Sequence, residues 1–261
     1  MLNRSILPRL LALAMLVLGV GIVGAQEAPT AVRVRIAHLA PFPGSDNATI
    51  TVEIDGAAVG GTLKYGDHTA YVALAGAAGP RTVEVFRDGV VALTDSVTLA
   101  DGDSSLIVTG DDDQVPLDVL VINDTLADPG EGMVGLRVTH VAAIGATIEA
   151  TQVDVCSQEG QIFHGSAAGL RYNRTTTYRL IPANTYDLKV TRFIDIENAE
   201  CSGAVVIDPP PIPLAEGTKT TLFLVGDGNN QPLAVFTFDA GLIGDDSPTE
   251  SRLYLPAVRA N

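Results

Sequence analysis

The chain has 261 residues, and its 31 Asp and Glu outnumber its 16 Lys and Arg, so the formal net charge is −15. This excess of negative charge repels nucleic acids and anionic bilayers, and no cluster of basic residues offsets it, so a nucleic-acid role is not expected. Tryptophan is absent and there are only 6 Tyr and 7 Phe, which argues against a carbohydrate-binding surface built on a broad aromatic platform.

Residues 1–25 are predicted to be a signal peptide. Arg4 and Arg9 precede an apolar run over residues 10–23, and small residues lie directly before Gln26. The run is short for a membrane span, and an uncleaved anchor is the alternative. Cleavage would remove two arginines and no acid, which leaves a net charge of −17. We therefore expect a secreted protein, extracellular or on the cell surface, without a membrane span in the mature chain.

Alternating apolar and polar residues predict β-strands along most of the mature chain. The segments with this pattern are residues 32–36, 50–54, 83–85 and 186–190. Asp55-Gly56 follows the second segment and predicts a tight turn. Residues 222–225 are apolar throughout, which predicts a more fully buried strand.

The predicted strands recur roughly every 8 to 15 residues, separated by Gly, Pro, Asn and Asp, and no segment after residue 25 has a convincing helical period. This spacing is typical of an antiparallel sandwich or barrel. We expect an all-β fold made of two tandem antiparallel β-sandwich domains of immunoglobulin-like or transthyretin-like type.

Matching landmarks in the same order indicate that a unit of about 105 residues is duplicated. His38 returns as His140, the segment 99–102 returns as 214–217, and Gly110-Asp111 returns as Gly226-Asp227, at offsets of 102, 115 and 116. The expected organisation is a first sandwich over 32–126, a linker over 127–133, a second sandwich over 134–240 and a C-terminal tail over 241–261.

The only two cysteines, Cys156 and Cys201, lie in the second copy. In an exported chain they are expected to form a disulfide, which would close a loop of about 45 residues and add roughly 4 kcal/mol of stability by the chain-entropy model. The second copy carries about 13 extra residues between Val190 and Leu214, and the bridge would hold this insertion. Two free thiols, or half of a zinc site, are the alternatives.

His38 and His140 occupy equivalent places at the ends of predicted strands. A ligand-binding or proton-exchanging role is one interpretation. Repetition in both copies favours a structural role instead, with each ring bonded to a backbone carbonyl.

The acidic loops are the candidates for metal binding. Asp111 and Asp113 in the first copy, and Asp227 and Asn229 in the second, offer hard oxygen ligands near glycines, which suits calcium. No glutamate stands at the twelfth position of a calcium loop, and solvated turns need no metal, so no cofactor is expected and calcium is the only candidate.

The tail contains Leu253-Tyr254-Leu255-Pro256 and ends near Arg259. It resembles short endings of exported bacterial proteins, which implies an export or surface-retention tag over 253–259. A last edge strand or a disordered end is the other interpretation.

The repeated unit resembles the bacterial family of secreted domains called domain of unknown function 4397. The first copy carries the family's strand ending in histidine (residues 35–41) and its strand followed by an Asp-Gly turn (50–56). The second copy matches at residues 137–140 and 153–155, but Cys156 replaces an aromatic residue and the Asp-Gly turn is missing. The resemblance implies a secreted or envelope β-domain, often in tandem, and brings no known activity or catalytic residues.

Signatures of common enzymes, such as Gly-x-Ser-x-Gly, His-Glu-x-x-His and phosphate-binding glycine loops, are missing from the sequence. We therefore expect no enzyme but a non-catalytic module of the cell envelope that acts in interaction or structure. The alternative is a carbohydrate- or calcium-dependent ligand-binding module. The partner, an extracellular or cell-surface protein or glycan, is not identified by the residues.

Overall fold

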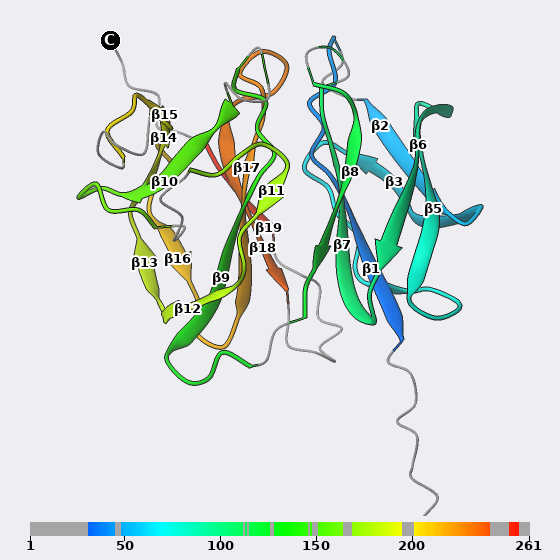
Figure 1. The fold of residues 1–261 in the computed structure, drawn as a ribbon, viewed down its shortest axis with the longest axis horizontal. Coiled ribbons are helices and arrows are strands. Elements are labelled where there is room, and N and C mark those ends of the chain that lie inside the picture. The colour runs from blue at the N-terminus through cyan, green and yellow to red at the C-terminus, as the bar shows by residue number, and fades with distance from the viewer. Residues whose placement is uncertain are drawn as a thin grey trace, which may run out of the picture.

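The computed structural model describes residues 31–44, 48–111, 113, 115–125, 128–145, 147, 151–163, 169–194, 201–240 and 251–255. These residues form an all-β protein, and none of them lies in an α-helix. Figure 1 shows the strands gathered in two groups that stand side by side. We call residues 31–125 the first half and residues 128–255 the second half. The expected signal peptide lies outside the described residues.

The first half contains two four-stranded sheets. Its strands are β1 (Val32–His38), β2 (Thr49–Ile54), β3 (Ala57–Lys64), β4 (Val72–Ala73), β5 (Gly79–Arg87), β6 (Val90–Leu99), β7 (Gly102–Thr109) and β8 (Asp118–Asn123). The inner sheet, which faces the second half, has the order β4-β1-β7-β8, and the outer sheet has the order β3-β2-β5-β6.

The second half has one large inner sheet and a divided outer layer. Its strands are β9 (Met133–His140), β10 (Val153–Ser157), β11 (Arg174–Thr175), β12 (Arg179–Pro182), β13 (Asn184–Tyr186), β14 (Leu188–Arg192), β15 (Val205–Ile207), β16 (Ile212–Leu214), β17 (Lys219–Val225), β18 (Ala234–Ala240) and β19 (Ser251–Tyr254). The inner sheet has the order β11-β9-β17-β18-β19, with β12 also on β9. The outer layer consists of the sheet β10-β14-β15 and the two-stranded ribbon β13-β16.

The hairpin of β2 and β3 shows how the local sequence sets the structure. Ile50, Val52 and Ile54 are buried and alternate with partly exposed polar residues, as a strand with one covered face requires. Asp55 and Gly56 then both adopt positive φ angles, 52° and 76°, which a two-residue turn between right-twisted strands needs. The predicted strand and the predicted turn are both confirmed.

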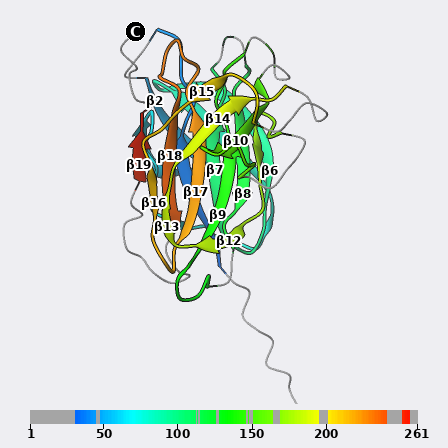
Figure 2. The same ribbon diagram turned by 90° about the vertical axis from the view of Figure 1, so that its left-hand side faces the viewer.

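The sheets stack as four layers, with the two inner sheets in the middle (Figures 1 and 2). One apolar core lies between the two sheets of the first half, and another between the inner sheet and outer layer of the second half. A third core joins the halves, and its largest members are Phe223, Phe236 and Phe238 from the second half with Leu39 and Ile107 from the first. The two halves are therefore packed against each other through buried apolar side chains.

Strand β17 is buried along its whole length, and this confirms the buried strand predicted from the apolar run over 222–225. Leu222 and Leu224 point into the core of the second half, whereas Phe223 and Val225 point into the core between the halves. A strand in the middle of a sheet that is covered on both faces has no solvent side, so its side chains do not alternate in polarity.

Two features of the sheets differ from the expectation. The strands are not all antiparallel, because β1 pairs with β7 and β9 pairs with β17 in parallel. Each parallel pair is joined through the strands of the outer layer, a connection long enough to bring the chain back in the same direction. The alternating run over 186–190 is also two strands, because it divides at Asp187 between β13 and β14, which belong to different sheets.

Equivalent contacts occur in both halves. His38 lies opposite Val108 in the parallel pair β1 and β7, and His140 lies opposite Leu224 in the pair β9 and β17. Thr69 accepts a hydrogen bond from the amide of Ile36 at 3.0 Å, and Thr176 accepts one from the amide of Val138 at the same distance. The two histidines are 102 residues apart and Val108 and Leu224 are 116 apart, as the landmark offsets predict, and the two threonines, at 107, fall between these values.

Candidate functional site

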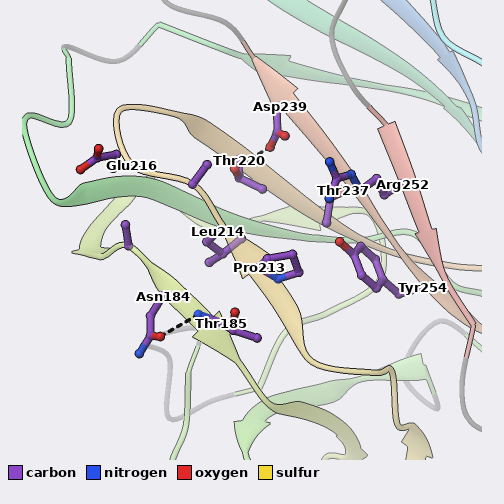
Figure 3. Close-up of a pocket in the computed structure, with 12 residues that line it drawn as sticks. Asn184, Thr185, Pro213, Leu214, Glu216, Thr220, Thr237, Asp239, Arg252 and Tyr254 are labelled. Carbon is purple, nitrogen blue, oxygen red and sulfur yellow. Dashed lines mark hydrogen bonds between the residues drawn. The ribbon is translucent and has the colours of Figure 1, made fainter.

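A groove in the second half bears polar side chains and has a volume of about 430 Å³. It lies between the inner sheet and the β13-β16 ribbon, as Figure 3 shows. We call it the β16–β19 groove, and its lining is Ala183, Asn184, Thr185, Pro213, Leu214, Ala215, Glu216, Thr220, Thr237, Asp239, Arg252 and Tyr254.

Five side chains from three neighbouring strands form the floor of the groove: Thr220 of β17, Thr237 and Asp239 of β18, and Arg252 and Tyr254 of β19. The hydroxyl of Thr220 donates a hydrogen bond of 2.7 Å to Oδ1 of Asp239. Arg252 lies opposite Thr237 in the pairing of β18 and β19, so it is held next to the other floor residues by strand register. The floor therefore combines hydroxyls, a carboxylate, a guanidinium and one aromatic ring on a rigid sheet.

The opposite wall of the groove is made by β13, β16 and the turn after β16. The side chain of Asn184 accepts a hydrogen bond of 2.8 Å from the amide of Thr185, and Pro213 lies on the Tyr254 side of the groove in Figure 3. Glu216 caps the chain entering β9, because its Oε2 accepts a hydrogen bond of 3.1 Å from the amide of Gly132. The wall thus combines three polar residues with the apolar Ala183, Pro213, Leu214 and Ala215, and local hydrogen bonds fix its polar side chains.

The four predicted calcium candidates come together in one place. Asp111, Asp113, Asp227 and Asn229 all line a cavity of about 380 Å³ between the ends of the two halves. Two loops more than a hundred residues apart in the sequence therefore form a single acidic cavity, and none of its lining residues is basic.

Both loops already use a carboxylate to organise their own backbone. Oδ1 of Asp111 accepts hydrogen bonds from the amides of Asp113 and Val115, at 3.0 and 2.7 Å. Oδ1 of Asp227 accepts three backbone hydrogen bonds, and its Oδ2 accepts one of 2.6 Å from the side chain of Asn230. Across the described part of the chain, no three or more His, Cys, Asp or Glu side chains are arranged to hold a metal ion. Calcium binding at these residues stays a prediction.

A buried ionic cluster lies where the two inner sheets face each other. Arg35 and Arg137 are almost completely buried, and both approach the carboxylate of Asp124. Nε of Arg35 donates to Ser105 at 3.0 Å, and Nε of Arg137 donates to Thr221 at 2.8 Å, so the two arginines have equivalent partners. Alternation places Arg35 on the polar face of β1, and that face is covered because the second half packs on it.

Asp124 is the carboxylate that both arginines share. Its Oδ1 accepts a hydrogen bond from Arg137, its Oδ2 lies 3.9 Å from Arg35, and the same oxygen accepts hydrogen bonds from Ser105 and Tyr71. Burial alone would raise the pKa of Asp124, but the two guanidinium charges and these hydrogen bonds outweigh burial and hold the pKa below its ordinary value. The cluster is thus ionised and joins the halves.

His38 and His140 are the last residues of β1 and β9, and both are fully buried. Nε2 of His140 lies 2.5 Å from the carbonyl oxygen of Thr151. In each case the amide two residues later points to Nδ1, at 3.4 Å for His38 and 3.3 Å for His140. Burial lowers the pKa of each imidazole to about 4, so both rings are neutral at neutral pH. Their structural role stays a prediction.

Cys156 and Cys201 form a disulfide, with an S–S distance of 2.05 Å and a Cα–Cα distance of 6.0 Å. Cys156 lies on β10 and is fully buried, and the bridge fixes Cys201, which precedes β15, against that strand. The insertion in the second half is therefore tied to the outer layer at one covalent point.

The tail segment is partly described. Residues 251–254 form β19, which pairs antiparallel with β18 and thereby supplies Arg252 and Tyr254 to the groove. An edge strand is thus observed there, and residues 256–261 lie outside the described residues.

Sequence inspection missed the β16–β19 groove. Threonine is common in strands, so Thr220 and Thr237 give no warning that they line a hollow. Tyr254 stands in the segment 253–259, for which a tag and a last edge strand are both predicted, and Arg252 lies just before it. One signal was present. In β18 the apolar alternation stops at Val235, and the next two inward positions are Thr237 and Asp239.

Residues 32–148 match the family model described as "Domain of unknown function (DUF4397)". The match covers the first half and the beginning of the second, and it supports the family resemblance that the sequence motifs indicate. No curated protein matches the chain. In the described part of the chain, no helix has the length and apolar character needed to cross a membrane.

Proposed function

We propose, starting from the family match over residues 32–148, that the chain is a secreted, non-catalytic protein of the cell envelope built from two tandem DUF4397-type sandwich domains. The finer fold type would be immunoglobulin-like or transthyretin-like. In this proposal the protein binds another envelope component, or connects components, and carries out no reaction.

The observation that carries the proposal is that the two halves are packed against each other into one body. The core and the buried ionic cluster between the halves make them one continuous four-layer body, with the outer sheets on its two sides (Figure 1). The disulfide is compatible with an oxidising compartment outside the cytoplasm. A strongly acidic surface favours solubility in that compartment.

The proposal is tested with the purified chain from residue 26 onward. Added to isolated cell envelopes of the source organism, it should sediment with them in a saturable manner, and an excess of unlabelled protein should displace it. A broad panel of hydrolase substrates should show no turnover. A protein that stays in the supernatant at all concentrations, or turns over any substrate of the panel, would contradict the proposal.

Calcium-dependent ligand binding is the second candidate function, because the predicted oxygen ligands line one acidic cavity. Addition of about 1–10 mM CaCl₂, above the dissociation constants of roughly 0.1–1 mM that extracellular calcium modules have, should then raise the melting temperature, whereas MgCl₂ should not. Asp113→Asn combined with Asn229→Ala should abolish that rise. Equal melting temperatures with and without calcium would remove this candidate.

A further inference from the structure

The interior of the second half turns polar at one end, where the strand pattern calls for a core. On β17 the side chains that face the outer layer are Leu224, Leu222 and then Thr220. On β18 they are Val235, Thr237 and then Asp239, because the alternate residues point into the core between the halves. Thr220 and Thr237 are only 1% and 4% exposed, so polar groups occupy buried positions beside an open groove. Positions that break the pattern of the fold are where function is expected.

The groove is built from features that distinguish the second half from the first. In the first half, β6 is one continuous strand paired along β5, whereas the corresponding outer layer of the second half is divided into a sheet and the β13-β16 ribbon. The second half also adds β19, and Thr237 stands where the first half has Val121, whereas Thr220 and Asp239 have the polar counterparts Ser104 and Asn123. The insertion, the divided layer and the last strand therefore converge on this groove.

We propose that the β16–β19 groove binds a short carbohydrate. This inference rests on the proposed function as an interaction module and names the ligand class of one of its surfaces. The floor places a hydroxyl, a carboxylate and a guanidinium side by side, from Thr220, Asp239 and Arg252, and these are the types of group that hydrogen-bond to the vicinal hydroxyls of a sugar. The ring of Tyr254 and the ring of Pro213 supply apolar surface on the same side, against which a sugar ring can pack.

The charges of the lining fit a neutral ligand better than an ion. Two carboxylates, Asp239 and Glu216, share the groove with the guanidinium of Arg252, so its formal charge is −1, smaller than the −3 of Asp111, Asp113 and Asp227 in the acidic cavity between the halves. A volume of about 430 Å³ is within the usual range of small-ligand sites. The five floor residues stand on paired strands, so the site is formed before the ligand arrives and binding costs little conformational entropy.

The test is calorimetric titration of the full chain from residue 26 with four soluble trisaccharides: cellotriose, chitotriose, maltotriose and mannotriose. At least one should bind saturably. Tyr254→Ala, which removes the ring, and Asp239→Asn, which removes the charge at the same size, should each weaken that binding about tenfold or more. Tyr254→Phe should retain most of the affinity.

Leu253→Ala is the matched control. Leu253 is a neighbour on the same strand, 45% exposed, and outside the lining of the groove, so its loss should leave the affinity unchanged. Melting temperatures within a few degrees of the parent show that each variant is folded. Absence of binding to all four sugars, or equal affinity in Tyr254→Ala, would overturn the inference. Sedimentation with envelopes that persists in both groove variants would leave the proposed function standing and reject the groove as its site.

Discussion

At the scale of single residues, the molecule depends on one carboxylate shared by two buried arginines. A buried ion pair contributes little net stability compared with an apolar replacement, but removing one partner leaves the other charge buried and uncompensated. Asp124 is the partner of both Arg35 and Arg137, and it lies at the contact between the halves. Its loss is therefore more damaging than the loss of an exposed ion pair.

We expect Asp124→Ala to lower the free energy of unfolding by about 3–5 kcal/mol, because both guanidinium groups stay buried. Asp55→Asn is the control, since it removes an ion pair with Arg81 at a solvent-exposed site and keeps a residue that tolerates the positive φ angle of the turn, so its effect should be far smaller. Urea unfolding followed by circular dichroism measures both. Equal effects of the two substitutions would show that the buried cluster has no special role.

The two buried histidines make stability depend on pH in a defined direction. Their folded pKa, about 4, is below the unfolded value of about 6.5, so the unfolded chain binds more protons between these values. Stability should be full above pH 6.5 and should fall as the pH drops toward 4. In NMR spectra the imidazole signals of His38 and His140 should not titrate between pH 8 and 5. Midpoints near pH 6.5 for both rings would contradict this prediction.

At the scale of elements, the repeated Gly-Asp landmark marks the loop that follows β7 and the loop that follows β17. Gly110 and Gly226 have φ angles of 92° and 87°, and in each a Cβ atom would overlap the carbonyl oxygen of a proline, Pro116 or Pro232. The next residue, Asp111 or Asp227, then caps the backbone of the loop. The landmark is therefore kept in both halves by the geometry of the loop.

Gly226→Ala should destabilise the protein by roughly 2–4 kcal/mol, from the positive φ angle and the overlap with Pro232 together. Gly228→Ala is a matched control, because Gly228 also has a positive φ angle, 76°, but a Cβ there meets only ordinary contacts with Leu233. It should cost about 1 kcal/mol. Thermal melts of the two variants give the comparison, and equal losses would rule out the overlap as the cause.

At the scale of the whole molecule, the halves are held together by more than the chain that connects them. Among the described residues, ten buried apolar side chains form the core between the halves, and the ionic cluster crosses the same contact. Buried apolar surface of this kind gives most of the free energy of association, while the paired charges add specificity.

A protease site inserted after Asp128 should therefore leave the halves associated after cleavage. Size-exclusion chromatography should show one peak at the elution volume of the uncut protein, with two bands on a denaturing gel. Phe223→Asp in the cleaved protein places a charge in the core between the halves and should separate them into two peaks. Separation of the cleaved parent protein would mean that the linker, and not the contact, keeps the halves together.

The sequence by itself determined the local features of this protein. Short-range rules predict the strands over 32–36 and 50–54, the Asp55-Gly56 turn and the buried strand over 222–225. The disulfide follows because Cys156 and Cys201 are the only two cysteines and can form only one pair. The tertiary structure decided which surfaces meet. Periodicity shows that a strand has two unlike faces, but it does not show what covers each face, so the burial of Arg35 opposite Arg137 was not foreseeable. The shared cavity of Asp111 and Asp227 and the β16–β19 groove also arise from contacts between distant segments, which no local pattern encodes.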